Sequence, residues 1–470
     1  MLIFYLLWHG FGVMIFKFKI LTMIFRIFIF GVLVLGMRTG YAQEKKWTLQ
    51  DCIDYGVEQS LKMQQQKFQN DNRRLEVRDA ALGLLPWINN FSPSFSYNYG
   101  RSIDPETNTY GNMQYKTLGG LGVGGGVTLF AGFSGVNRVR MAKIAKLQGL
   151  EYTEQLANDI AEQVMRAFFT LVYAEEQIKI TLEQLENTNL QLKKIQREYE
   201  LGRRPKSDLF DIQAQQASDE YQLISCQNDR ANAQVSLKHL MNYQEGNDLE
   251  VCVDSLNRIL PVKEVNDLNV IYTNAMKSLP EALVAGYDVR IYKLREYTTK
   301  ANFAPSFGMN GGISFGSYSS QNGRDFWTQI SDKNRIGKYF GFNMSFPIFS
   351  GLSRHSNLRR AKNNYQNARI SYRQTEQSIY TEIQKAILDL ESQVQQYEIA
   401  LKKEKFSELA YRAGRKKYEQ GLITIIELNT TANNYLQAKY DLLKARLNYV
   451  LQKKMVDFYK GIPLQTKIGE

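Results

Sequence analysis

The stretch Phe130–Ser134 (FAGFS) returns later in the chain as Phe349–Ser353 (FSGLS), at an offset of 219 residues. The same offset, without a gap, places Tyr199–Gly202 (YELG) on Tyr418–Gly421 (YEQG). A register that is shared over so many residues is typical of two copies of one structural unit, and such a repeat organises everything else in a fold. The sequence therefore predicts two tandem structural repeats.

Each repeat begins with two stretches in which large apolar residues alternate with small or polar ones. They cover 91–99 and 121–129 in the first repeat, and 303–315 and 340–348 in the second. A period of two indicates β-strands. One face of each strand is aromatic and aliphatic while the other consists of Gly, Ser, Asn and Thr, as in a membrane barrel, although a soluble sandwich would have the same period.

A long stretch without proline follows each pair of strands, at 135–199 and 353–418. In the first of them, apolar residues recur every seven positions from Leu150 to Tyr199, which is the spacing of a left-handed coiled coil. A helix of this length would extend over about 100 Å. Both stretches are therefore predicted to be single, very long helices.

Gly202 and Gly421 should end these helices, because glycine readily adopts the left-handed conformation of a helix C-cap. Second helices are predicted from 207 to 243 and from 425 to 459, so that each repeat consists of two strands and one long helical hairpin. Two further helical stretches are predicted at 48–85 and 271–302.

Composition excludes several classes of protein. The 470 residues include 59 Lys and Arg against 47 Asp and Glu, and these charges look interleaved along the chain, which argues against a nucleic-acid-binding surface. A hydrophobic content of 44% excludes a disordered chain. Cys52, Cys226 and Cys252 lack the spacing of a metal or redox motif, and His239 and His355 lie too far apart in sequence to suggest a zinc site.

Residues 1–42 have the three parts of a secretory signal peptide: basic residues without acidic ones, an apolar run at 27–35 and a small-x-small end at 40–42. The rival interpretation is a membrane anchor, but the apolar run is shorter than the roughly 20 residues that cross a bilayer. We expect cleavage after Ala42, while Met14 and Met23 are alternative starting residues.

The mature chain then divides into a first repeat, 43–268, and a second repeat, 269–470. Four strands cannot close a barrel, and an open strand edge cannot persist in lipid because its backbone groups would lack hydrogen bonds. Two copies would supply eight strands around a filled interior, and three would supply twelve around an open lumen. The small residues on the inward face favour three copies.

Taken together, these features resemble the outer-membrane efflux protein (TolC) family over essentially the whole mature chain. The resemblance implies an α+β membrane protein, a homotrimer whose twelve-stranded outer-membrane β-barrel continues as a long α-helical coiled-coil barrel into the periplasm. It is carried by the tandem repeat, by the strand ends Leu129–Gly132 and Ile348–Gly351, and by the tips Tyr199–Gly202 and Tyr418–Gly421 followed by Asp208, Leu209, Glu427 and Leu428.

The same resemblance implies the channel component of a tripartite efflux or type I secretion system. Such a duct docks on a periplasmic adaptor protein and an inner-membrane pump, contacts outer-membrane lipid, and passes substrates passively, without an enzymatic step or a cofactor. The alternative is a structural coiled-coil envelope protein that has no conducting channel. The exported substrate cannot be identified from the residues, because a wide aqueous duct needs no specific pocket.

The resemblance also implies where the functional residues lie. In this family the hairpin tips meet the adaptor, and acidic residues beyond the second tip narrow the periplasmic entrance. Glu427 matches the first acidic position and Tyr418 a tyrosine that helps to hold the entrance shut, whereas Thr430 and Ile423 replace a second acid and an arginine. The gate candidates are Glu427, Asp208, Asp211, Tyr418, Tyr199, Arg203 and Arg204. The docking candidates are Leu201, Gly202, Gly421, Leu422, Ile423, Leu209 and Leu428.

Simpler roles remain open for some of these residues. Asp208 and Asp211 could equally cap the helix that follows the first tip, where acidic residues are favoured. Leu209 and Leu428 could equally pack the ends of the hairpins. Charge pairs among the residues of the first tip could supply the contact that Ile423 cannot make.

Overall fold

A computed structural model of the chain describes residues 46–89, 91, 93–101, 103, 107–110, 114–244, 249–252, 261, 266–319, 329, 333 and 336–464. The predicted signal peptide lies outside these ranges. The chain separates into two units, and in the smaller one Trp47 forms an isolated parallel bridge with Val251. All the helices and strands described below belong to the larger unit.

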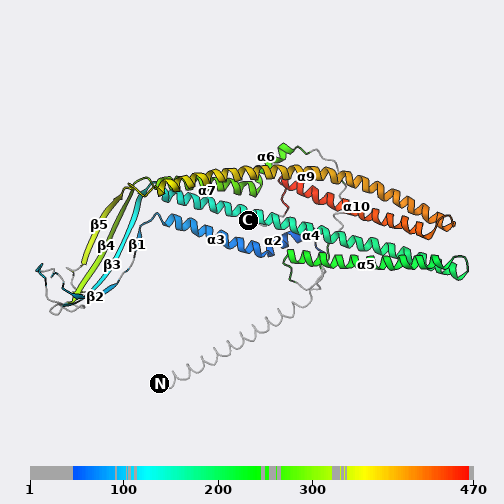
Figure 1. Cartoon of the computed structure of the whole chain (residues 1–470), viewed down its shortest axis with the longest axis horizontal. Coiled ribbons are helices and arrows are strands. Elements are labelled where there is room, and N and C mark those ends of the chain that lie inside the picture. The colour runs from blue at the N-terminus through cyan, green and yellow to red at the C-terminus, as the bar shows by residue number, and fades with distance from the viewer. Residues whose placement is uncertain are drawn as a thin grey trace, which may run out of the picture. The chain divides into compact units, whose positions relative to one another are not determined.

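One antiparallel sheet is built from both repeats (Figure 1). It runs in the order β1–β3–β4–β5, and β2 also pairs with β3, on the same edge as β1, so the sheet is four strands wide. Among the described residues, no further strand pairs with β5 or with β1 and β2 on their outer sides. The strands are β1 (Trp87–Asn89), β2 (Ser94–Gly100), β3 (Gln114–Ala131), β4 (Ser306–Ser319) and β5 (Ile336–Ser345).

The register of the sheet confirms the predicted alternation. Val127 lies opposite Met309, which lies opposite Phe342, so these apolar side chains share one face. The other face carries mainly glycine, serine and asparagine. One detail differs, because β3 has an irregularity between Thr128 and Phe130 that leaves Leu129 without a partner and brings Phe130 opposite Phe307.

All four predicted strands differ in their limits from the observed ones: β3 extends beyond 121–129 at both ends, and β4 covers 306–319 instead of 303–315. Proline explains the differences in the other two. Of the stretch predicted as one strand at 91–99, only 94–99 is strand, as part of β2; β1 lies before the stretch, and Pro93 stands between the two strands. The last strand ends at Ser345, not at residue 348, and Pro347 follows it closely. Proline has no backbone N–H to donate to a ladder, which explains both limits.

The two long helical hairpins are confirmed. They are formed by α4 (Ser134–Glu200) with α5 (Lys206–Leu240), and by α9 (Ser353–Glu419) with α10 (Ile425–Tyr459). The first helix of each hairpin has 67 residues and the second has 35, and every boundary repeats at the offset of 219.

Each of the two other predicted helices is broken once. The stretch 48–85 contains α2 (Leu49–Gln59) and α3 (Leu61–Leu82), and 271–302 contains most of α6 (Leu268–Ser278) and α7 (Pro280–Ala301). Ser60 is extended and its hydroxyl accepts a hydrogen bond from the Met63 backbone N–H, as an N-cap does. Leu279 is extended because the next residue is proline.

The predicted seven-residue seam holds only in the middle of α4. Ala157, Val164 and Leu171 are buried there, whereas Leu150 is half exposed. Toward the hairpin tip the buried positions shift by three residues, to Ala174, Thr181, Thr188 and Ile195. The two threonines bond to Tyr440 and to the buried Asp219, so this seam is partly polar and an apolar pattern does not reveal it.

No helix within these ranges is long and apolar enough to cross a membrane.

Candidate functional site at the hairpin tips

The two hairpin tips have the same backbone turn (Figure 1, α4–α5 and α9–α10). Gly202 has a φ of +71° and Gly421 a φ of +75°. The Arg203 N–H bonds to the Glu198 carbonyl at 2.8 Å, and the Leu422 N–H bonds to the Lys417 carbonyl at 2.9 Å, which is the pattern of a Schellman C-cap. A methyl group at either glycine would meet no atom within 4 Å, so the backbone conformation, not crowding, calls for glycine.

The helices that follow the tips begin in different ways. In α5, Pro205 precedes the first residue and fixes the entry of the chain. In α10, Thr424 caps the helix by accepting a hydrogen bond from the Glu427 N–H at 3.3 Å. Asp208 and Glu427 both lie in the first turn, where a carboxylate is favoured by the helix dipole.

Arg204 connects the two tips. Its guanidinium pairs with Glu198 at 3.1 Å and with Asp208 at 3.4 Å, both in its own hairpin. The same group donates to the Tyr418 carbonyl at 3.2 Å and lies 4.4 Å from the centre of the Tyr418 ring. Because these contacts reach the second hairpin, Arg204 bridges residues that stand 214 positions apart in the sequence.

Tyr418 is buried beneath this arginine, with 6% of its surface exposed. Burial raises the pKa of Tyr418 to about 12; Arg204 opposes the shift, and Asp208 and Glu198 add to it. The hydroxyl oxygen has no hydrogen-bond partner among the described residues. The phenol therefore stays neutral, and its ring contributes through packing and through the contact with Arg204.

An apolar cluster lies under the tips and includes residues from both hairpins. Ile195 and Ile212 come from the first, and Tyr418, Ile425 and Leu428 from the second. Leu209 and Ile423 pack against this cluster, and Leu428 is almost completely buried. For these three docking candidates the structure favours the simpler role, packing of the hairpin ends.

Leu201 and Leu422 differ from the other leucines of the site. They stand at equivalent positions of the two tips and are 60% and 68% exposed. An exposed apolar side chain next to a glycine turn is a suitable contact for a partner protein. Leu201, Gly202, Gly421 and Leu422 therefore remain the docking candidates.

The gate candidates are divided by their contacts. Asp208 is engaged with Arg204, whereas Glu427 is exposed and has no ion pair within the described part of the chain. Arg203 and Tyr199 are exposed at the first tip. Asp211 is partly buried and lies near enough to Tyr418 to raise its pKa.

Sequence reasoning missed several contacts between the hairpins. Glu198, which pairs with Arg204, was not a candidate, and neither were Lys194 and Glu419, whose charged groups lie 3.4 Å apart across the two hairpins. Gln191 also donates to the Tyr411 hydroxyl at 3.2 Å. The offset of 219 residues could have indicated these contacts, because it makes α4 and α9 end at equivalent positions. Charged residues near the two ends can then lie side by side.

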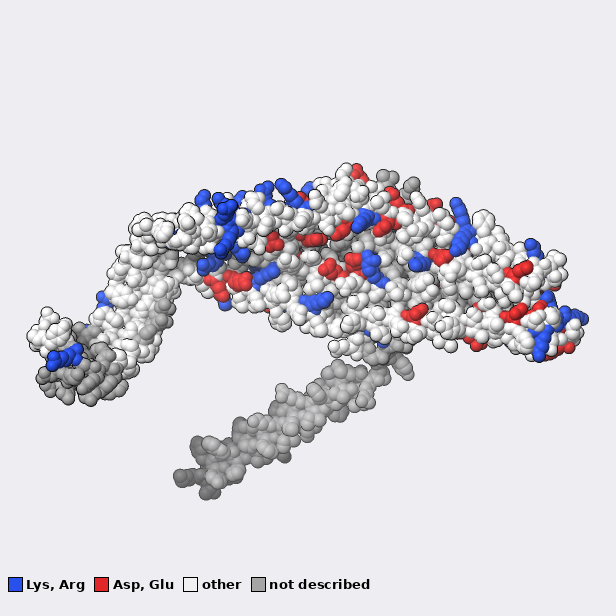
Figure 2. Space-filling view, viewed as in Figure 1, with Lys and Arg blue, Asp and Glu red and all other residues white. Residues whose placement is uncertain are grey.

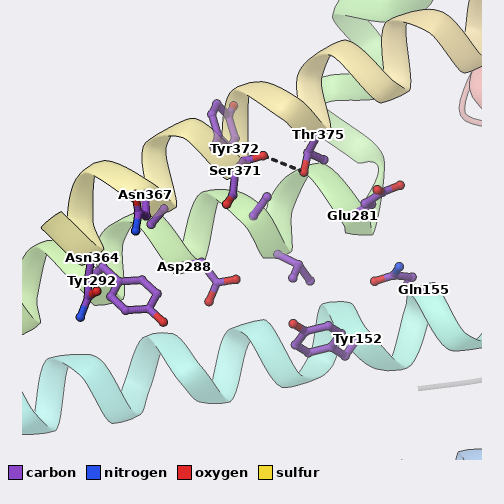
Figure 3. A pocket seen from close by; sticks show the side chains of 13 residues that line it. Tyr152, Gln155, Glu281, Asp288, Tyr292, Asn364, Asn367, Ser371, Tyr372 and Thr375 are labelled. Atoms are coloured by element: carbon purple, nitrogen blue, oxygen red, sulfur yellow. Dashed lines mark hydrogen bonds between the residues drawn. The ribbon is translucent and has the colours of Figure 1, made fainter.

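A hollow lies among the helices, far along α4 from the tips (Figure 3). It has a volume of about 550 Å³ and is lined by α4, α7 and α9, with Tyr152, Glu281, Asp288 and Tyr372 facing it. Asp288 accepts a hydrogen bond from the buried Gln148 at 2.8 Å.

The acidic side chains near this hollow influence one another. Burial raises the pKa of Glu281, and the negative charges of Glu382 and Asp159 raise it further. The described residues contain no cluster of three His, Cys, Asp or Glu that could hold a metal.

Comparisons with known proteins agree with this architecture. CusC superposes with a TM-score of 0.76 at 16% identity, covering 90% of this chain and 95% of CusC. The CmeC outer membrane channel of Campylobacter jejuni gives 0.73 at 17% identity, with coverages of 90% and 87%. The open state of the Neisseria gonorrhoeae MtrE outer membrane channel gives 0.70 at 17%, with 90% and 91%. No curated protein matches by sequence.

A family model described as outer membrane efflux protein matches residues 57–243 and 298–456, well over half of the chain. The two matched segments contain the first long hairpin and, except for the last three residues of α10, the second, together with both tips. The chain with its paired 67-residue helices and four-strand-wide sheet belongs to the outer membrane efflux protein family.

Proposed function

We propose that this protein is the outer-membrane channel of a tripartite efflux or type I secretion assembly and passes substrates passively to the cell exterior. The observation that carries the proposal is the sheet. It has one apolar face, its two outer edges pair with no further strand in the described part of the chain, and it leads directly into two 67-residue helices. An apolar sheet face belongs in lipid, and the unpaired edges call for further copies of the chain.

Three copies satisfy this requirement best. Each contributes a sheet four strands wide, so three give twelve strands and a lumen too wide for side chains to fill. The small residues of the opposite face, such as Gly122, Gly308 and Ser314, would line that lumen. The long helices would continue the duct into the periplasm.

Detergent extraction of the full chain tests the assembly. We expect a trimer in the outer-membrane fraction that conducts ions in a planar bilayer. A water-soluble monomer, or a trimer without conductance, would instead favour a structural coiled-coil protein of the cell envelope.

The hairpin tips are proposed to dock on a periplasmic adaptor, with Leu201 and Leu422 as the apolar contacts. Leu201→Ser with Leu422→Ser should reduce export and adaptor cross-linking at least tenfold, while trimers form normally. Leu61→Ser is the matched control, because Leu61 is 61% exposed but belongs to α3. Normal cross-linking by the double variant would remove the leucines from the docking surface.

Arg204 is proposed to hold the two hairpins of one protomer together at a closed entrance. At the second tip, Ile423 stands where the family resembled has an arginine. Arg204 supplies a cation from the first tip instead, and its guanidinium contacts Tyr418. The entrance is proposed to be lined by residues of both tips that are exposed or partly buried. They are Glu427, Asp211 and Tyr199, with Arg203 beside them.

A further inference from the structure

The positive charge of this protein is concentrated where the helices leave the sheet. Residues 134–150 of α4 and 353–375 of α9 contain ten Lys and Arg and no Asp or Glu. These two short segments therefore carry most of the net charge of the whole chain, which is +12. The prediction that the charges are interleaved is therefore wrong for these two segments. Figure 2 shows Lys and Arg gathered over the helices close to the sheet and mixed with acidic residues farther along.

Four of these cations occupy equivalent positions in the two repeats. Arg140 and Lys143 in α4 correspond to Arg359 and Lys362 in α9, again at the offset of 219. All four are exposed. Within the described ranges none of them forms an ion pair or a hydrogen bond, although other cations of the same helices do. We call these four residues the basic collar.

The helices that carry the collar begin beside the apolar side of the sheet. Arg140 and Lys143 stand three residues apart and therefore share a face of α4, and Phe133 immediately precedes this helix. The Phe133 ring packs edge-on against Phe130 with 5.5 Å between ring centres, and Phe130 lies opposite Phe307 on the apolar face. Leu352 precedes α9 in the same way and is likewise exposed.

The distances match the surface of a bilayer. Arg140 and Arg359 follow Phe133 and Leu352 by seven residues, which is about 10 Å along a helix, and the lysines follow at about 15 Å. The polar headgroup layer on each side of a bilayer is about 5 to 8 Å thick, and long cationic side chains extend toward it from a neighbouring position. With the apolar face in the hydrocarbon, the collar thus stands at headgroup level or just beyond it.

We propose that the basic collar binds the phosphate groups of anionic phospholipids in the leaflet on the helix side of the barrel. Clustered exposed Lys and Arg next to a membrane attract anionic headgroups, and unpaired side chains lose no existing partner when they bind. The proposal rests on the proposed function, because it assumes that the apolar face of the sheet lies in a membrane.

Lipid titration of the full chain in nonionic detergent, followed by native mass spectrometry, tests the proposal. The collar variant is Arg140→Gln, Lys143→Gln, Arg359→Gln and Lys362→Gln. We expect phosphatidylglycerol to bind it at least tenfold more weakly than the parent chain, and phosphatidylcholine to bind equally to both. The matched control is Lys193→Gln, Lys385→Gln, Lys402→Gln and Lys405→Gln, which removes four exposed cations elsewhere and should change phosphatidylglycerol binding less than twofold.

Three results would contradict the proposal that the collar binds anionic lipid. They are unchanged phosphatidylglycerol binding by the collar variant, an equal loss in the control variant, and displacement of the lipid by millimolar inorganic phosphate, which would indicate a site for free anions. Insertion into neutral phosphatidylcholine vesicles is measured separately. If the parent chain does not insert, the proposed membrane channel fails; if the collar variant inserts normally, any loss of phosphatidylglycerol binding belongs to the collar and not to misfolding.

Discussion

Arg204 is the single residue whose loss should change the tips most. Its ion pairs with Glu198 and Asp208 hold it in the first hairpin, and its contacts with Tyr418 tie that hairpin to the second. Arg204→Gln leaves two partly buried carboxylates without a cation, at a cost of about 2 kcal/mol. We expect the reconstituted channel to open more often, with a several-fold rise in mean conductance.

Arg203→Gln is the matched control for this measurement. It removes the same charge from the neighbouring position, where the side chain is exposed and contacts no charged group among the described residues. If both variants conduct alike, net charge at the tip matters and the bridge to Tyr418 does not.

Because of Tyr418, the stability of the tips should decrease at alkaline pH. The folded-state pKa of this tyrosine is about 12, against about 10 for a free tyrosine, so the unfolded state releases its proton first as pH rises. The stabilising effect of the neutral phenol is therefore fully present below pH 10 and is lost between pH 10 and 12. The free energy of unfolding, measured by denaturant titration at each pH, should fall over this window in the parent chain and much less in Tyr418→Phe, while Tyr199→Phe, which alters an exposed tyrosine, should behave like the parent.

The sequence identified Arg204 and Tyr418 as candidates but not as partners. Single residues could be selected because family positions and charge mark them locally. Their pairing could not, since it depends on how two helices of 67 residues set their ends side by side. The burial of Leu428 and the half-burial of Leu209 were likewise undecided until the cluster under the tips was seen.

At the scale of elements, the polar face of the sheet depends on a row of small residues. Gly124 lies opposite Gly312, which lies opposite Tyr339, and the tyrosine side chain reaches back across both glycines. A methyl group at Gly312 would stand 2.8 Å from the Tyr339 ring. Gly312→Ala should therefore destabilise the assembled sheet by about 1 to 3 kcal/mol, the usual cost of overpacking.

A double-mutant cycle in thermal melting checks this contact. The combination of Gly312→Ala with Tyr339→Ala should cost clearly less than the sum of the two single changes. Gly316→Ala is the control, because a methyl group there meets nothing within 4 Å. Additive effects would mean that the tyrosine does not lie over the glycine in the assembled protein.

Periodicity predicted elements better than it predicted their ends. The four long helices were located to within a few residues, because a pattern sustained over dozens of positions outweighs local exceptions. The breaks at Ser60 and Leu279 were missed, since one capping residue or one proline is a weak signal inside a helical pattern. The polar positions Thr181 and Thr188 were missed because their hydrogen bonds, not their hydrophobicity, bury them.

At the scale of the whole molecule, Glu427 should decide how the duct responds to cations. In a trimer, three copies of this exposed carboxylate would face one axis and attract multivalent cations. Trivalent cations added on the periplasmic side should therefore block the channel. Glu427→Gln should weaken this block at least tenfold in single-channel recordings. Asp208→Asn should leave the block largely intact, because Asp208 is engaged with Arg204, and should raise the open probability instead. Equal block of parent and Glu427→Gln would mean that the entrance lies elsewhere.

The identical lengths of the two hairpins restrict how this gene can change over time. Each long helix has 67 residues and each returning helix 35, so both tips end level. An in-frame deletion of seven residues from α4 alone would draw one tip back by about 10 Å and separate Arg204 from Tyr418. Such a deletion can be accommodated only if α5, α9 and α10 shorten by the same amount, so the reach of the protein should evolve in coordinated steps of whole heptads.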